Sequence, residues 1–210
     1  MVSGANQADV TWDEVDLPSW LRSGVRQATG RSDRPFKAQA EVFSVCDTWR
    51  SGAAPGGATN LLATAANGSG KTMAFGVPAL KSIDFAVRKP QVLILSKTVK
   101  GCLDQNKDRI DGIVSASRDS PDSPSASYGS ALVDGGRAQA YAGVGGAFPV
   151  ADQVLFGTPN GMAAFLDETV AGWSSPAAAA KKAKAKAKAS KRRCVFFYLP
   201  LHSTRILLTV

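Results

Sequence analysis

Residues 65–72 read Ala-Ala-Asn-Gly-Ser-Gly-Lys-Thr, and this stretch decides the fold. It matches the phosphate-binding loop pattern G-x-x-x-x-G-K-[ST], with Ala65 in place of the first glycine. Gly68 and Gly70 permit backbone dihedrals that direct successive amide N–H groups at phosphate oxygens. Lys71 can reach the β- and γ-phosphates, and the Thr72 hydroxyl can ligate Mg²⁺, so these two are the candidate catalytic residues. The predicted site for a nucleoside triphosphate and Mg²⁺ consists of Ala65, Ala66, Asn67, Gly68, Ser69, Gly70, Lys71 and Thr72.

The sequence around this loop has the pattern of an α/β fold. An apolar run over 60–66 has the length of a strand, and a helix is expected from Lys71 until Pro78 disturbs it. Because buried strands that alternate with helices form parallel sheets, we expect a sheet covered on both faces, with ligands at the carboxyl ends of its strands. Further strands are expected over 91–96, 131–133 and 153–157, and helical segments over 37–50, 98–111 and 161–171. Residues 115–130 are Ser/Pro/Asp-rich and are expected to form a solvent loop or an insertion.

The flanking residues resemble those of the DEAD-box RNA helicases. The continuation KTMAFGVPAL is similar to the family sequence after its phosphate loop, and residues 34–39 are similar to the end of the family's Q motif. In that motif a glutamine reads adenine, so the resemblance implies that Gln39 binds the base through its amide donor and acceptor. Trp12 stands where the family has an upstream aromatic. Residues 36–38 depart from the family's Thr-Pro-Ile, and no aromatic near Ser32 is placed to stack on adenine.

Three later segments resemble the RNA-binding motifs of the same family. LSKTVKGCLDQ (95–105) takes the place of PTRELAxQ, a Gly-Gly pair follows a short strand, and QVLFGTPNGM resembles the segment that ends in TPGR. The resemblance implies contacts to the RNA phosphate backbone that do not depend on base sequence. A plain exposed loop and a simple helix start are the alternative readings. The implied RNA-binding residues are Lys97, Thr98, Lys100, Gly135, Gly136, Thr158, Pro159, Asn160 and Gly161.

The resemblance also implies a domain organisation. It describes a P-loop NTPase of RecA-like fold, incomplete at its C-terminus, that would work with a second RecA-like lobe. The chain contains no Asp-Glu-Ala-Asp, the acidic motif that holds Mg²⁺ for hydrolysis in this family, so we expect a fragment with negligible RNA-stimulated hydrolysis. The expected divisions are an N-terminal flank (1–34), a partial ATP-binding lobe (35–175), an Ala/Lys-rich segment (176–193) and apolar terminal strands (194–210).

The net charge of +8 belongs to one segment. Residues 181–193 hold six Lys and two Arg, and removing them from the total of 25 leaves 17 basic residues against 17 acidic ones. This run is a solvated linker, a nuclear-localisation signal or a non-specific RNA-binding patch. We therefore expect an intracellular protein, nuclear or nucleolar rather than cytoplasmic. No signal peptide or membrane span is expected, because no apolar run reaches about 18 residues.

Two other functions stay open at this point. A catalytically inactive pseudo-helicase would bind nucleotide or RNA without turnover. A small P-loop kinase would need an acceptor site and an arginine-rich lid, and the paired Arg192 and Arg193 lie in the Lys-rich run. The three cysteines, Cys46, Cys102 and Cys194, have neither disulfide nor metal-ligand spacing, so we interpret them as reduced thiols.

Overall fold

The computed structural model describes residues 7–30, 32–50, 60–65, 68–96, 103–133, 152–171, 195–198 and 205–209. The helices are α1 (Ser19–Ala28), α2 (Lys37–Arg50), α3 (Lys71–Lys81), α4 (Asp104–Ala116), the 3₁₀ turn η4 (Pro124–Ala126) and α6 (Pro159–Ala171). The strands are β1 (Asn60–Ala63), β2 (Val92–Leu95), β3 (Ser130–Val133), β4 (Val154–Gly157), β5 (Val195–Tyr198) and β6 (Arg205–Thr209). In the described part of the chain, no helix has the length and apolar character needed to cross a membrane.

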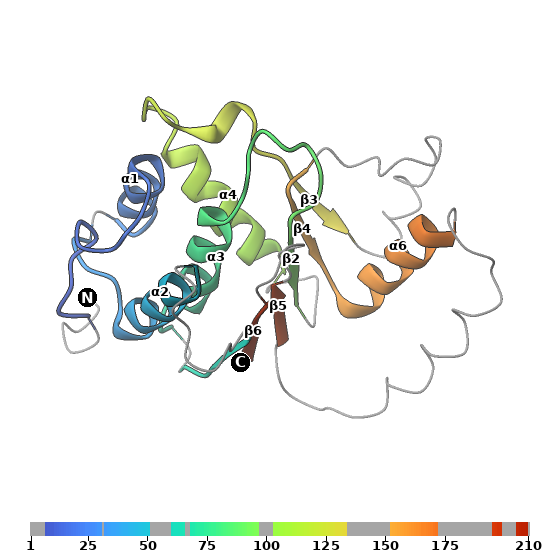
Figure 1. The fold of residues 1–210 in the computed structure, drawn as a ribbon, viewed down its shortest axis with the longest axis horizontal. Helices are drawn as coiled ribbons and strands as arrows, with labels where there is room; N and C mark the ends of the chain where they lie inside the picture. Colours follow the sequence, from blue (N-terminus) through green and yellow to red (C-terminus); the bar gives the residue numbers. More distant parts are fainter. Residues whose placement is uncertain are drawn as a thin grey trace.

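The strands form two three-stranded sheets that meet where β5 lies beside β2 (Figure 1). One sheet has the order β2-β4-β3 and is parallel throughout, as predicted. The other has the order β1-β6-β5, in which β6 is parallel to β1 but β5 is antiparallel to β6. A parallel connection needs about a dozen residues, whereas only residues 199–204 separate β5 from β6, so this last pair forms an antiparallel hairpin.

Side chains that alternate along β2 and β4 enter two different hydrophobic cores. Val92, Ile94, Val154 and Phe156 belong to the large core beneath helices α1 to α4. Their chain neighbours, among them Leu95 and Leu155, join a smaller core with Met162 and Phe165 of α6. Since successive residues of a strand point to opposite faces, the helices must cover both faces of the sheet. Figure 1 shows this arrangement, with α6 on one side and the other helices opposite. The predicted two-sided α/β architecture is confirmed.

The N-terminal residues pack into the large core. Trp12, Leu21 and Val25 are fully buried, and the ring of Trp12 lies 5.8 Å from that of Phe43 in α2. Residues 7–12 run along residues 33–36, where the Ala8 N–H donates to Pro35 and the Trp12 N–H donates to Asp33. The segment predicted as a flank therefore contributes the apolar face of an amphipathic helix, α1, to the same core as the phosphate-loop helix.

Two local expectations were wrong. Pro78 does not disturb α3, which continues to Lys81 with all residues from Met73 to Leu80 buried. Burial of the whole helix outweighs the loss of one backbone N–H. Residues 115–130 are not simply a solvent loop, because α4 continues to Ala116 and Pro124 is buried. This segment packs on the rest of the fold through Tyr128, whose ring lies 6.4 Å from that of Phe85.

The contact between α1 and α4 depends on a glycine. A β-carbon at Gly24 would overlap with the backbone carbonyl of Ile113, whereas a β-carbon at Gly112 would meet nothing within 4 Å. We expect Gly24→Ala to lower the free energy of unfolding by about 2–3 kcal/mol, because the helices must separate. Gly112→Ala should raise it by about 0.5–1 kcal/mol, because alanine is the better helix former. Urea unfolding of both variants tests this, and equal stability of the pair would contradict the close α1–α4 contact.

Candidate phosphate-binding site

Gly68 and Gly70 have the backbone conformations that a phosphate loop needs. Their φ angles are +80° and +77°, in the left-handed region that residues with a side chain rarely adopt. Gly70 is the N-cap of α3, so the loop leads directly into a helix N-terminus with its partial positive charge. Ala66 and Asn67 of the predicted site lie outside the described residues. The described loop residues thus have the geometry of an anion-binding turn.

Gln39 ties the Q-motif helix to this loop. Its side-chain Nε2 donates to the Gly70 carbonyl at 3.1 Å, and its Oε1 accepts from the Phe36 backbone N–H at 2.9 Å. The side chain is 2% exposed, so both bonds are shielded from water. Gln39 therefore lies at the phosphate loop, where its amide links the Gly70 carbonyl to the Phe36 N–H. Its role in reading adenine stays a prediction.

Lys71 lies in the first turn of α3 and donates through Nζ to the Ala65 carbonyl at 2.9 Å. This bond spans the loop, from Ala65 at its start to Lys71 at the beginning of α3. An ammonium group held on a neutral carbonyl can move to a phosphate, which is a stronger acceptor because it is charged. The residues present fit a nucleotide phosphate: two left-handed glycines, a helix N-terminus and a lysine converge on one turn.

Thr72 follows Lys71, and its hydroxyl Oγ1 donates to Oδ1 of Asn106 in α4 at 2.8 Å. Asn106 is 5% exposed and was not among the predicted site residues. The sequence did contain a signal for it, because Asn106 shares a helical face with the buried Leu103, Ile110 and Ile113. A polar residue on an apolar, buried helical face indicates a specific role for that residue, whereas an exposed apolar residue is common and indicates little.

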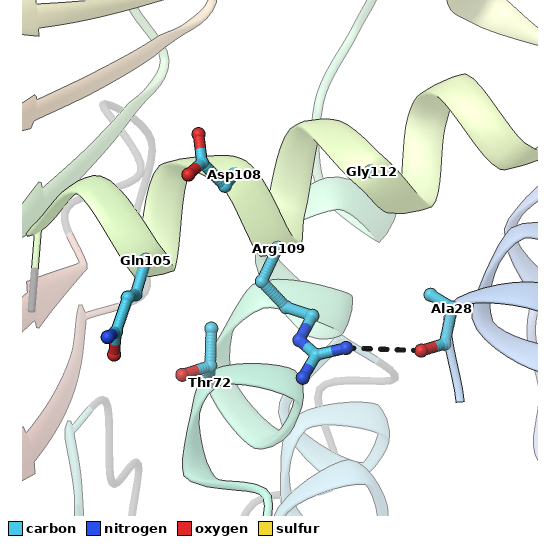
Figure 2. A pocket seen from close by; sticks show the side chains of 6 residues that line it. All are labelled: Ala28, Thr72, Gln105, Asp108, Arg109 and Gly112. Atoms are coloured by element: carbon cyan, nitrogen blue, oxygen red, sulfur yellow. Dashed lines mark hydrogen bonds between the residues drawn. The ribbon is translucent and has the colours of Figure 1, made fainter. Parts of the chain in front are cut away.

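A hollow of about 470 Å³ lies next to Thr72, between the end of α1 and the exposed side of α4. Figure 2 shows Arg109 extending from α4 across this hollow toward the end of α1. Its guanidinium donates to the Ala28 carbonyl at 3.1 Å. Gln105 and Asp108 line the same hollow. The site therefore combines a cationic phosphate loop with an adjoining polar hollow.

The predicted RNA-binding segments follow three strand ends at one edge of the sheet. Leu95, Gly157 and Val133 are register partners, so β2, β4 and β3 all end level with one another. Lys97, Thr98, Lys100, Gly135 and Gly136 lie outside the described residues. Thr158 caps α6, because its Oγ1 accepts from the Gly161 N–H at 3.1 Å and Pro159 takes the first helical position. Asn160 is exposed and Gly161 is buried. RNA contacts at these residues remain a prediction.

Cys46 fits its interpretation as a buried thiol. Burial raises its pKa to about 12, with a further increase from Asp47, so the thiol stays protonated at neutral pH. Cys102 and Cys194 lie outside the described residues. Within the described ranges there is no cluster of three or more His, Cys, Asp or Glu residues that could hold a metal ion. The role of Thr72 as a ligand of Mg²⁺ stays a prediction.

A family comparison covers the segment that holds this site. The model of the DEAD/DEAH box helicase family matches residues 38–110, from α2 through the phosphate loop into α4. Residues 38–110 are therefore similar to part of a DEAD/DEAH box helicase domain. The resemblance to this family is confirmed over the matched segment, which includes Gln39 and residues 65–80, whereas residues 34–37 lie outside the match. Comparison with the curated proteins gives no match.

Solved helicase structures share the fold of this lobe. A variant of S. cerevisiae Dbp5 bound to a Gle1 variant and IP6 has a TM-score of 0.52 at 18% identity, over 75% of this chain and 34% of its own. S. cerevisiae Dbp5 bound to RNA and ADP BeF3 has a TM-score of 0.52 at 17% identity, over 73% and 33%. The fold is that of a RecA-like helicase lobe, and the chain spans about a third of the length of these structures.

The loop geometry makes a prediction about two glycines. Alanine at Gly68 or Gly70 must adopt a strained positive φ, which costs about 1–2 kcal/mol. At Gly70 the new methyl group would also displace the Gln39 amide and lie 2.8 Å from Phe36 Cδ2, whereas at Gly68 it would meet nothing within 4 Å. We therefore expect Gly70→Ala to lower the free energy of unfolding more than Gly68→Ala in urea titrations.

A double mutant isolates the part of the stability loss in Gly70→Ala that comes from the displaced Gln39 amide. In a Gln39→Ala background, the difference between the two glycine variants should shrink, because the displaced amide is gone. A difference that is unchanged in that background would show that Gln39 does not pack on Gly70.

Proposed function

We propose that this chain is the ATP-binding lobe of a DEAD-box-type ATP-dependent RNA helicase. Residues 65–72 hold the triphosphate, with Lys71 neutralising phosphate charge and Thr72 as a ligand of Mg²⁺. The bound Mg²⁺ would supply charge neutralisation at the phosphates. Gln39 lies at the same loop and contributes to nucleotide binding. One observation carries the proposal: Gly68 and Gly70 both adopt positive φ at the start of α3, within the segment that matches the helicase family.

RNA binding is the second part of the proposal. The segments 97–100, 135–136 and 158–161 follow β2, β3 and β4, whose carboxyl ends lie level at one edge of the sheet. A strand of RNA laid along this edge would meet all three. Of these segments, residues 158–161 are described. There the N-terminus of α6 and the Asn160 backbone N–H can bind a phosphate, since Pro159 has no N–H and that of Gly161 donates to Thr158. The similar Dbp5 structure contains bound RNA, which supports RNA binding as part of the proposal.

Unwinding of RNA requires more than this lobe. A second RecA-like lobe and an acidic motif II would complete the helicase, and the sequence contains no Asp-Glu-Ala-Asp. We propose that ATP hydrolysis by the 210-residue chain alone is negligible. The Lys/Arg-rich run at 181–193 favours a nuclear or nucleolar location and adds a salt-sensitive attraction to RNA. The domain boundaries at residues 34/35 and 175/176 are also part of this proposal.

Nucleotide binding is tested through Lys71. We expect Lys71→Ala to weaken the binding of Mg-ADP or Mg-ATP at least tenfold, because the lysine supplies a charge-assisted bond to the phosphates. Titration calorimetry on the 210-residue chain gives the affinities. Lys89→Ala is a matched control, since Lys89 is an exposed lysine in the loop before β2 and the change removes the same charge.

Two results would contradict the proposal. If the wild-type chain does not bind nucleotide, or if Lys71→Ala and Lys89→Ala bind equally well, residues 65–72 are not a phosphate site. The same preparations address turnover. Robust RNA-stimulated hydrolysis that Lys71→Ala abolishes would show that the chain needs no second lobe.

A further inference from the structure

A hydrogen bond between Thr72 and Asn106 joins α3 to α4 at the phosphate loop. Thr72 is the second residue of α3 and Asn106 the third residue of α4, and Thr72 Oγ1 donates to Asn106 Oδ1 at 2.8 Å. A hydroxyl has one hydrogen and two lone pairs. Because Asn106 takes the hydrogen, both lone pairs of Thr72 point elsewhere. This is the orientation that a metal ligand needs, since a hydroxyl binds a cation through a lone pair.

The surroundings of Asn106 argue against a purely structural role. Its side chain is 5% exposed, on the helical face that also carries Leu103, Ile110 and Ile113. Its Nδ2 is buried, with no hydrogen-bond partner among the described residues. A buried N–H group without a partner is destabilising, whereas an apolar side chain of similar size would fill the position without that loss. Residues that break a packing rule in this way are typical of functional sites.

We propose that Asn106 is a positioning residue for the metal ligand Thr72. Its side-chain carbonyl accepts the hydrogen bond from the Thr72 hydroxyl. The hydroxyl is thereby held with a lone pair directed toward the Mg²⁺ of the bound nucleotide. Asn106 itself touches neither metal nor phosphate, and it acts through Thr72. This inference rests on the proposed nucleotide-binding function and deepens it. It states that the gain in nucleotide affinity from Mg²⁺ depends on the Thr72–Asn106 hydrogen bond between α3 and α4.

The variant Asn106→Leu tests this role. Binding of a fluorescent ADP to the 210-residue chain is measured with Mg²⁺ and again with EDTA. We expect the variant to lose about three- to tenfold in affinity with Mg²⁺, the effect of one hydrogen bond, and to match the wild type in EDTA. Thr72→Val, which removes the metal ligand itself, should show the same pattern with a loss at least as large. The double variant should lose no more than Thr72→Val, because Asn106 acts only through Thr72.

Thermal unfolding separates positioning from packing. Because leucine removes the buried unpaired N–H, we expect Asn106→Leu to have a melting temperature equal to or above that of the wild type. If it does not fold, Asn106→Ala, which fits within the same space, has the same expected binding pattern. An affinity loss of equal size in Mg²⁺ and EDTA, losses that add in the double variant, or tighter binding with Mg²⁺ would overturn the positioning role.

The outcomes also separate this inference from the function on which it rests. If the wild type and Lys71→Ala both fail to bind fluorescent ADP, the proposed function falls and the role of Asn106 falls with it. If the wild type binds in a Lys71-dependent way while Asn106→Leu retains its full Mg²⁺ enhancement, the proposed function stands and the positioning role alone is overturned.

Discussion

The burial of α3 is the constraint on which the rest of the structure depends. Eight consecutive residues, Met73 to Leu80, are buried, so this helix has no exposed face along most of its length. It packs against α1, α2 and α4, and its core extends to the inner face of β2 and β4. A helix enclosed in this way keeps its position whatever its intrinsic propensity, which explains why Pro78 is tolerated. The phosphate loop ends where this helix begins. The buried helix therefore fixes the position of the end of the loop and the direction of the helix dipole at the site.

Polar side chains from the neighbouring helices then attach to the start of α3. Gln39 of α2 donates to the carbonyl of Gly70, and Asn106 of α4 accepts from the hydroxyl of Thr72. Lys71 closes the loop on the Ala65 carbonyl. The side chains of Gln39 and Asn106 are buried, so water competes little for their hydrogen bonds. A nucleotide would therefore enter a site whose backbone is already held by hydrogen bonds within the protein. On binding, Lys71 would exchange its bond to the Ala65 carbonyl for bonds to the phosphates.

Much of this arrangement could be predicted from the sequence. The phosphate loop is a local motif, and the continuous apolar runs at β2 and β4 are what a strand buried on both faces requires. The features that were missed depend on contacts between distant residues. Trp12 is buried because the chain brings it to Phe43, and β5 is antiparallel because its link to β6 is short. The sequence marks Asn106 as a polar residue on an apolar helical face, but its contact with Thr72 depends on the packing of α4 against α3.

Amide hydrogen exchange with and without Mg-ADP tests the central claim most directly, namely that a preformed buried helix presents a phosphate loop to the nucleotide. Peptides that cover residues 73–80 should exchange slowly in both states, because their amides lie in the core. Peptides that cover residues 64–72 should exchange faster without nucleotide and slow down when Mg-ADP binds. Rapid exchange of residues 73–80 in the absence of nucleotide, or no change at residues 64–72 in its presence, would contradict the account.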